Sequence, residues 1–163
     1  MDASDVTTAR LALRPWSPDE LAAVPSGARM DHWAEDFPAE GDVVIAGFVA
    51  DRPNVNEYGQ RQVIERSTGL VVGSIGLFWP PTDGALEIGY GIVPSRRGLG
   101  YASEAARALA LFALAAPGVH TVCAEVELAN PASVRVLEKA GFRSLGDDGT
   151  TARFGVQLPD LNG

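Results

Sequence analysis

The stretch EIGYGIVPSRRGLGYASE, residues 87–104, is the most informative part of this chain. An apolar run leads into a glycine-broken turn, and an uninterrupted helical pattern begins at Tyr101. Backbone N–H groups around Gly98 and Gly100 precede this helix and have no acceptor within it. Together with the positive end of the helix dipole, such groups form an anion-binding site. The stretch therefore predicts a strand, a phosphate-binding turn and a helix.

The residues of this turn favour a phosphate ligand over a purely structural role. Gly98 and Gly100 carry no Cβ, so a phosphate can approach the backbone closely. Arg96 and Arg97 directly precede them and add positive charge. No Gly-Lys-Ser/Thr follows, which excludes a Walker loop. The third glycine of a dinucleotide fingerprint is also missing. The ligand is therefore a phosphate compound of another class.

The rest of the pattern predicts one mixed α/β domain over residues 1–163. Strands are expected at residues 8–14, 43–49, 61–66, 70–78, 85–93, 120–128, 142–145 and 153–158. Helices are expected from Pro18, around Trp33, from Tyr101 to Ala115, and after Asn130-Pro131. Their order predicts a mostly antiparallel twisted sheet of about six or seven strands, flanked by about four helices, with one right-handed crossover.

Composition narrows the class of protein. Hydrophobic residues make up 46% and charged residues 21% of the chain, which favours a folded domain over disorder. A single cysteine, Cys123, excludes an internal disulfide and a multi-cysteine zinc site, and we expect it to be a small buried hydrophobe. Only two histidines, His32 and His120, are present. We therefore expect no metal site.

The charge pattern argues against some partners and suggests another. The net charge of −8 disfavours sequence-independent binding of nucleic acid. Residues 31–42 hold five acids and no base, which fits either a solvated surface or a mouth that attracts a cationic partner. No apolar run is long enough to cross a membrane, and the first residues are acidic where a signal peptide would be basic. We therefore expect a cytoplasmic protein.

Three segments together resemble the GNAT superfamily of N-acetyltransferases. RGLGYA at residues 97–102 matches its pyrophosphate motif, Arg/Gln-x-x-Gly-x-Gly/Ala. EIGYGI at residues 87–92 resembles its splayed fourth strand. NPAS at residues 130–133, followed by LEKAGF at residues 137–142, resembles its second conserved segment. The resemblance covers residues 8–158 and implies splayed central strands.

The segment from Thr8 to Pro15 and the strand that contains Gly89-Tyr90 also resemble the RimJ/RimL-type branch, whose members acetylate protein N-terminal amines or small amines. The resemblance implies acetyl-CoA as the donor, held along a strand edge and at the pyrophosphate turn. The residues implied in this binding are Ile92, Val93, Arg97, Gly98, Leu99, Gly100, Tyr101, Ala102, Ser103 and Asn130. Asn130 also fits a helix cap, and its side chain can serve both roles. Since relatives are often dimers, a homodimer is compatible with the resemblance.

Acetyl transfer needs a base for the amine and a proton for the leaving thiolate. No Cys–His pair suggests a covalent intermediate, so direct attack by the amine is the simpler mechanism. Two carboxylates compete as base: Glu87, which we prefer, acting through a water, and Glu125. The tyrosine that often serves as acid in the superfamily is replaced here by Leu137. Ser133 is the substitute in the RimL-like pattern, although it also fits a purely structural role at the helix terminus.

Other residues and other functions stay open at this stage. Tyr90 is a less favoured candidate than Ser133 for the acid, and Tyr101 fits a structural role. Trp33 and Phe37, with the acids of residues 31–42, fit either an acceptor site or, for Trp33, the core. The turn motif recognises the phosphates of CoA and not its acyl group, so another donor such as succinyl-CoA is an alternative. A non-catalytic CoA-binding module is a further alternative function.

Overall fold

The computed structural model describes residues 5–51 and 57–161. Its strands are β1 (Val6–Thr7), β2 (Leu11–Pro15), β3 (Gln60–Glu65), β4 (Leu70–Leu77), β5 (Ala85–Ile92), β6 (Thr121–Glu127), β7 (Arg143–Asp147) and β8 (Thr151–Val156). Its helices are α1 (Pro18–Ser26), α2 (Glu40–Ala50), α3 (Tyr101–Leu114), α4 (Pro131–Lys139) and α5 (Leu158–Leu161), with a short 3₁₀ turn, η1 (Pro94–Arg96).

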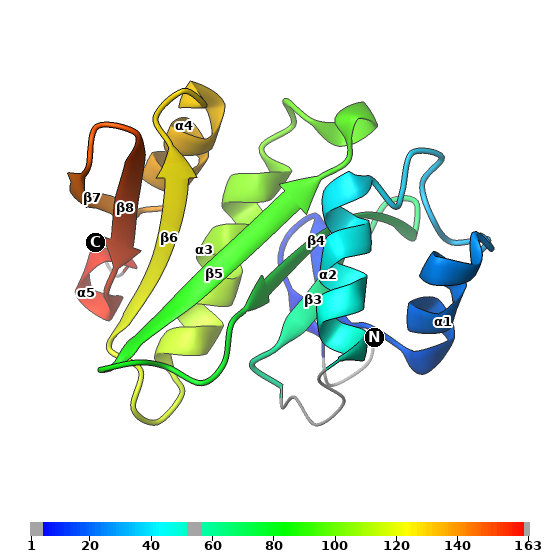
Figure 1. Ribbon diagram of the computed structural model, residues 1–163, viewed down its shortest axis with the longest axis horizontal. Coiled ribbons are helices and arrows are strands. Elements are labelled where there is room, and N and C mark those ends of the chain that lie inside the picture. Colours follow the sequence, from blue (N-terminus) through cyan, green and yellow to red (C-terminus); the bar gives the residue numbers. More distant parts are fainter. Residues whose placement is uncertain (1–4, 52–56, 162–163) are drawn as a thin grey trace.

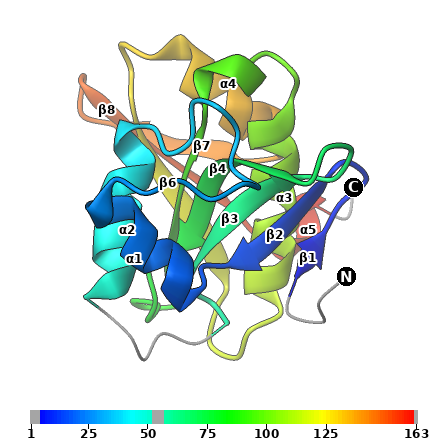
Figure 2. The same cartoon turned by 90° about the vertical axis from the view of Figure 1, so that its right-hand side faces the viewer.

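All described strands form one sheet in the order β1-β2-β3-β4-β5-β6-β8-β7. Every neighbouring pair is antiparallel except β5 and β6, which run parallel and are connected through α3. Helix α2 lies over one face of the sheet, and α3 crosses the other (Figures 1 and 2). The predicted mixed, mostly antiparallel fold is confirmed, with eight strands instead of six or seven and five α-helices instead of four.

The two parallel strands separate in the middle of the sheet. They pair only at Ala85–Glu87 of β5 and Thr121–Cys123 of β6. Beyond these residues the strands diverge toward their carboxyl ends, as Figure 1 shows. The predicted splay is confirmed, and it leaves a wedge-shaped gap beside β5. The turn after β5 and the start of α4 both lie at the wide end of this gap (Figure 1).

The strand predicted at residues 43–49 is wrong, because this segment lies within α2. A run of valine, isoleucine and phenylalanine has the composition of a strand, and a short apolar run cannot be assigned by periodicity alone. Contacts outside the run favour the helix. One carboxylate oxygen of Asp42 accepts from the backbone N–H of Ala39 (2.8 Å), while the other accepts from Ser74 Oγ on β4 (2.5 Å). Asp42 thereby fixes the first turn of α2 against the sheet.

The helix predicted around Trp33 is also wrong. Trp33 lies between two turns, in a loop that makes an isolated bridge to Val71 of β4. Its side chain is 4% exposed and packs edge-on against Phe37, which is fully buried, with ring centroids 5.3 Å apart. The core alternative for Trp33 is therefore confirmed, and neither ring is accessible to an acceptor.

The remaining expectations concern two single residues, two helix starts and membrane crossing. Cys123 is 3% exposed, as predicted for a small buried hydrophobe, whereas His120 is exposed. Helices α3 and α4 begin at Tyr101 and Pro131, the positions that their sequence signals predict. None of the described helices combines the length and the apolar character that crossing a bilayer would require.

Candidate active site

The turn between β5 and α3 presents a row of unpaired backbone donors. Within the described part of the chain, no protein acceptor faces the N–H groups of residues 98–102, and the first paired amide of α3 is that of Glu104, bonded to Gly100 O (3.1 Å). Gly98 (φ +81°) and Gly100 (φ +83°) adopt left-handed conformations that favour glycine. Gly100 is also the N-cap and brings no capping side chain. These donors are therefore available to an anion.

Two cations from distant segments approach this turn. A Cβ placed on Gly100 would lie 3.3 Å from Arg10 Nη2 and 3.6 Å from Lys139 Nζ. Arg10 also donates to the carbonyl oxygen of Leu99 (2.7 Å) and pairs with Glu104 (2.8 Å). The sequence analysis assigned neither cation to the turn. Lys139, the only lysine of the chain, ends α4 inside the LEKAGF segment, which is the one signal that could have indicated it.

The two arginines of the turn have different surroundings. Arg97 is exposed, and its Nε donates to the carbonyl oxygen of Ile92 (2.9 Å). The side chain of Arg96 is only 17% exposed and pairs with Glu65 (3.2 Å) and Glu35 (3.6 Å). Since two carboxylates balance the charge of Arg96, Arg97 is the arginine of the turn that stays a candidate for the anion site.

The hydrogen bonds between β4 and β5 show which backbone groups of β5 point toward the β5–β6 gap. Glu87 O accepts from Phe78 N and Val93 N donates to Val72 O, both at 2.9 Å, so these residues face β4. Residues of an antiparallel strand alternate between its two edges, so the intervening even-numbered residues face the gap. These are Ile88, Tyr90 and Ile92.

This alternation separates the two residues expected to bind the pantetheine arm. Ile92 faces the gap, in agreement with the expectation. The N–H of Val93 is already paired on the other edge, and its carbonyl oxygen accepts from Arg96 N (3.0 Å). Val93 is therefore poorly placed for the arm. Ile88 and Tyr90, which the sequence analysis did not assign to the arm, have the favourable orientation, and counting by twos from Ile92 would have found them.

A cavity of about 270 Å³ fills the gap between the two strands. Residues from both strands and from the start of α4 line it: Ile88, Gly89, Tyr90, Ala124, Glu125, Val126, Glu127, Asn130 and Ser133. The structure thus brings together Glu125, Asn130 and Ser133, which the sequence analysis singled out separately. Glu87 is exposed on β5 at the narrow end of the gap, where its backbone is in register with Cys123.

Asn130 and Ser133 form a reciprocal pair at the start of α4. Asn130 Oδ1 accepts from the backbone N–H of Ser133 (3.3 Å), which confirms the helix cap. Asn130 Nδ2 donates to Ser133 Oγ (3.0 Å), so the hydroxyl proton of Ser133 stays available to a ligand in the cavity. Tyr90 OH donates to the carbonyl oxygen of Ser133 (3.5 Å), and burial raises the pKa of this phenol. Tyr90 is therefore a neutral support for α4.

The structure adds Arg153, on β8, to the two candidate bases. Arg153 lies directly opposite Glu125 in the β6–β8 register, and their side chains approach to 3.6 Å. Arg153 Nη2 also donates to Cys123 Sγ (3.1 Å). Burial raises the pKa of the Cys123 thiol, which keeps it protonated and argues against a nucleophilic role. No local pattern predicts the pair with Arg153, because it depends on the strand register.

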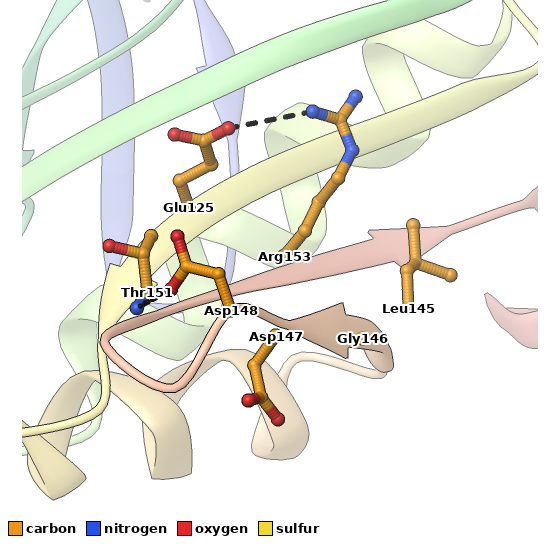
Figure 3. A pocket seen from close by; sticks show the side chains of 7 residues that line it. All are labelled: Glu125, Leu145, Gly146, Asp147, Asp148, Thr151 and Arg153. Atoms are coloured by element: carbon orange, nitrogen blue, oxygen red, sulfur yellow. Dashed lines mark hydrogen bonds and ion pairs between the residues drawn. The ribbon is translucent and has the colours of Figure 1, made fainter.

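A second, more open cavity of about 500 Å³ lies beside the first. Figure 3 shows Glu125 and Arg153 pointing toward one another along its wall, with Asp148 next to Thr151. Its lining residues are Glu125, Leu145, Gly146, Asp147, Asp148, Thr151 and Arg153. Glu125 lines both cavities, and two further acidic residues, Asp147 and Asp148, line this one.

The acidic segment 31–42 is partly engaged within the protein. Asp36 accepts from both Ser95 N and Ser95 Oγ (2.8 Å each), and Glu35 pairs with Arg96. Burial raises the pKa of Asp42 beside Ser74. Asp36 and Glu35 therefore connect the segment to the turn after β5, and Asp42 connects it to β4, whereas Asp31 and Glu40 are exposed.

A parallel pair of splayed strands, with an uncapped helix N-terminus at its wide end, is the architecture of the CoA-dependent N-acetyltransferases. A family model described as "Acetyltransferase (GNAT) domain" matches residues 10–143, and the chain belongs to this family. It is also 35% identical over 81 residues to the uncharacterized N-acetyltransferase YjdG of Bacillus subtilis (strain 168). This match covers 49% of the chain and 48% of the relative, about half the length of each.

Solved structures of acetyltransferases share the whole fold. A GNAT-family acetyltransferase from Bacillus anthracis is 22% identical, with a TM-score of 0.69, covering 94% of this chain and 98% of its own. One from Agrobacterium tumefaciens C58 is 21% identical, with a TM-score of 0.69 and coverages of 97% and 96%. A chimera of spermidine N-acetyltransferase SpeG from Vibrio cholerae and hSSAT is 17% identical, with a TM-score of 0.69 and coverages of 95% and 99%. At these identities the likeness establishes the fold alone.

Proposed function

We propose that this protein transfers an acetyl group from acetyl-CoA to a primary amine, by direct attack within a ternary complex. The observation that carries the proposal is the row of unpaired N–H groups at residues 98–102, placed at the wide end of the β5–β6 gap. A diphosphate matches these donors, and a narrow thioester-bearing arm matches the gap.

Different residues around the gap bind different parts of acetyl-CoA. The amides of residues 98–102 bind the diphosphate, with Arg97 and Lys139 adding charge. The pantetheine arm adds to the edge of β5 as an extra strand, bonded to the backbone of Tyr90 and to the N–H of Ile92, whose carbonyl oxygen already accepts from Arg97 Nε. The amide of Asn130 lies in the cavity wall, where it contacts the arm or the acetyl group.

The reaction needs two proton movements around one new bond. The amine nitrogen donates its lone pair to the thioester carbonyl carbon, and the C–S bond breaks when the tetrahedral intermediate collapses. A carboxylate accepts the proton that the amine nitrogen loses. The departing thiolate takes the hydroxyl proton of Ser133, which Asn130 leaves free by donating to the Ser133 oxygen. Water then returns a proton to the Ser133 oxygen, and the carboxylate releases to solvent the proton that it took from the amine. The products are an acetylated amine and CoA.

Glu125 is the better placed of the two candidate bases. It lines both cavities and therefore lies where donor and acceptor would meet. Arg153 holds its carboxylate from one side at 3.6 Å. Glu87, preferred from the sequence, lines neither of these two cavities and is the alternative, acting through a water.

A cationic amine suits the open cavity, because three carboxylates and one arginine line it. Spermidine, which appears in the name of one structural relative, is one such amine. Small amines of this kind also fit the RimJ/RimL-type branch. The cytoplasmic location and the homodimer remain predictions made from the sequence.

Calorimetry and a thiol-release assay test the proposal. CoA should bind to the isolated protein, and acetyl-CoA should release thiol with at least one amine of a panel of polyamines, amino acids, aminoglycosides and peptide N-termini. CoA binding without turnover on any amine would favour the non-catalytic module, and faster release from succinyl-CoA would change the donor. Absence of CoA binding would overturn the proposal.

Matched variants of the two carboxylates identify the base. Glu125→Gln should lower kcat about 100-fold and leave the Kd for CoA unchanged, because only the proton acceptor is lost. Glu87→Gln should change kcat by no more than about threefold. The reverse ranking would assign the base role to Glu87.

A further inference from the structure

Glu65 is a buried carboxylate next to the coenzyme turn, and the mechanism above gives it no role. It ends β3 and is 6% exposed. Its Oε2 accepts from Tyr101 OH (2.7 Å) and from Arg96 Nε (3.2 Å), while its Oε1 accepts from Thr68 Oγ1 (2.7 Å). A carboxylate buried this deeply needs such partners to remain charged.

The two partners on the turn side bracket the diphosphate-binding residues. Arg96 ends η1 directly before residues 97–100, and Tyr101 begins α3 directly after them. Glu65 therefore holds both ends of the turn from β3, which β4 separates from β5 in the sheet. The turn contains two glycines with positive φ, whose backbones have high conformational freedom in the absence of such restraints.

The electrostatics of this cluster favour the charged form of Glu65. Burial alone would raise the pKa of Glu65, but the hydrogen bonds from Tyr101 and Thr68 and the charge of Arg96 outweigh it, so the net pKa is lowered. The hydrogen bond to Glu65 raises the pKa of the Tyr101 phenol, which therefore remains a donor. The guanidinium of Arg10 lies over the face of this ring, 4.8 Å from its centroid.

We propose that Glu65 is a positioning residue that fixes the turn at residues 97–100 in the conformation that binds the coenzyme diphosphate. The proposal rests on the proposed function. Because donors that are already oriented lose little freedom on binding, the restraint from Glu65 favours coenzyme affinity. Arg96 is then a structural tie and not a phosphate ligand, and it connects the turn to the segment before α2 through Glu35.

The test compares Glu65→Gln with wild type in calorimetry, steady-state kinetics and thermal melting. Glutamine keeps an acceptor for Tyr101 but removes the charge that pairs with Arg96. The Kd for CoA and the KM for acetyl-CoA should rise about tenfold, while kcat stays within about twofold, because the reacting groups are untouched. The control is Glu35→Gln, which removes the solvent-exposed partner of Arg96 and should leave the Kd within about twofold.

The outcomes separate this inference from the proposed function. If wild type does not bind CoA, the proposed function fails. If wild type binds and folded Glu65→Gln binds equally well, Glu65 only stabilises the fold and the inference is wrong, even with a lower melting temperature. If Glu65→Gln does not fold, Tyr101→Phe and Arg96→Gln each remove one tie, and an unchanged Kd in both variants would overturn the inference.

Discussion

Helices α3 and α4 both begin at the wide end of the β5–β6 gap, yet their first turns differ in one respect (Figure 1). The N-cap of α3 is Gly100, which has no side chain, so the amides that follow stay unpaired. The N-cap of α4 is Asn130, whose oxygen accepts from Ser133 N and whose amide donates to Ser133 Oγ. One terminus is therefore open to an anion, and the other is closed and presents an oriented hydroxyl.

The difference shows how one structural feature can serve two chemical needs. A helix N-terminus favours negative charge, and a diphosphate needs several donors at once. A leaving thiolate needs a single proton donor at a fixed position. Capping by a side chain removes the first property and supplies the second, so the choice of glycine or asparagine at the cap assigns each helix its role.

The largest expected effect comes from closing the open terminus. Gly100→Glu places a carboxylate and a Cβ among the turn amides, near Arg10 and Lys139. We expect the Kd for CoA, measured by calorimetry, to rise at least about 100-fold, because the new charge competes for the donors and repels phosphate. Gly118→Glu is the matched control: Gly118 has φ +82°, lies at the far end of α3 and has nothing near its Cβ position. Tight CoA binding by folded Gly100→Glu would contradict the open-terminus account.

Removing the hydroxyl at the closed terminus should affect chemistry and not binding. Ser133→Ala should lower kcat about tenfold with acetyl-CoA, because the thiolate leaves without a nearby proton donor. Thiol release measures kcat, and calorimetry should give an unchanged Kd for CoA. Ser133→Thr keeps a hydroxyl and should restore most of the rate. Wild-type kinetics for Ser133→Ala would reduce this residue to a structural part of the cap.

Asn130 can be varied to separate its two hydrogen bonds. Asn130→Asp keeps an oxygen that accepts from Ser133 N but loses the donor to Ser133 Oγ, so we expect nearly wild-type unfolding free energy and kcat about fivefold lower. Asn130→Ala loses both bonds and should also destabilise the fold by about 1 kcal/mol. Chemical denaturation and thiol release measure the two effects. Equal kcat values for Asn130→Asp and wild type would show that the donor to Ser133 is dispensable.

The smallest expected effect concerns the cation shared between the two helices. Lys139 ends α4 but approaches the turn before α3, so Lys139→Gln should raise the Kd for CoA about threefold and weaken its dependence on salt. Lys139→Arg keeps the charge and should bind CoA like wild type. Titrations at low and high salt measure both properties. Identical salt dependence in Lys139→Gln and wild type would exclude a contact with phosphate.

The region around these two helices was predictable because its signals are local. The glycines before Tyr101 and the Asn-Pro pair before α4 act within a few residues, and both helix starts are confirmed. The segment at residues 28–50 was not predictable in this way. The valine-rich run of α2 satisfies a strand as well as a helix, and contacts such as Asp42 with Ser74 decide between them.

The candidate site shows the same division between local and distant contacts. The turn residues, Asn130 and Ser133 could be identified from motifs. The pairs Glu125 with Arg153, Glu65 with Tyr101 and Gly100 with Lys139 join distant segments, and each depends on sheet register or helix placement. The sequence therefore indicates which residues carry chemistry more readily than which residues hold them in place.

The central claim is that the unpaired amides before and within the first turn of α3 bind the diphosphate of CoA. Amide NMR spectra recorded during a titration with CoA test it most directly. We predict that the resonances of residues 98–102 move furthest, while the amide of Gly118, beyond the far end of α3, moves little. Saturable CoA binding that leaves the resonances of residues 98–102 in place and shifts amides elsewhere would contradict the claim.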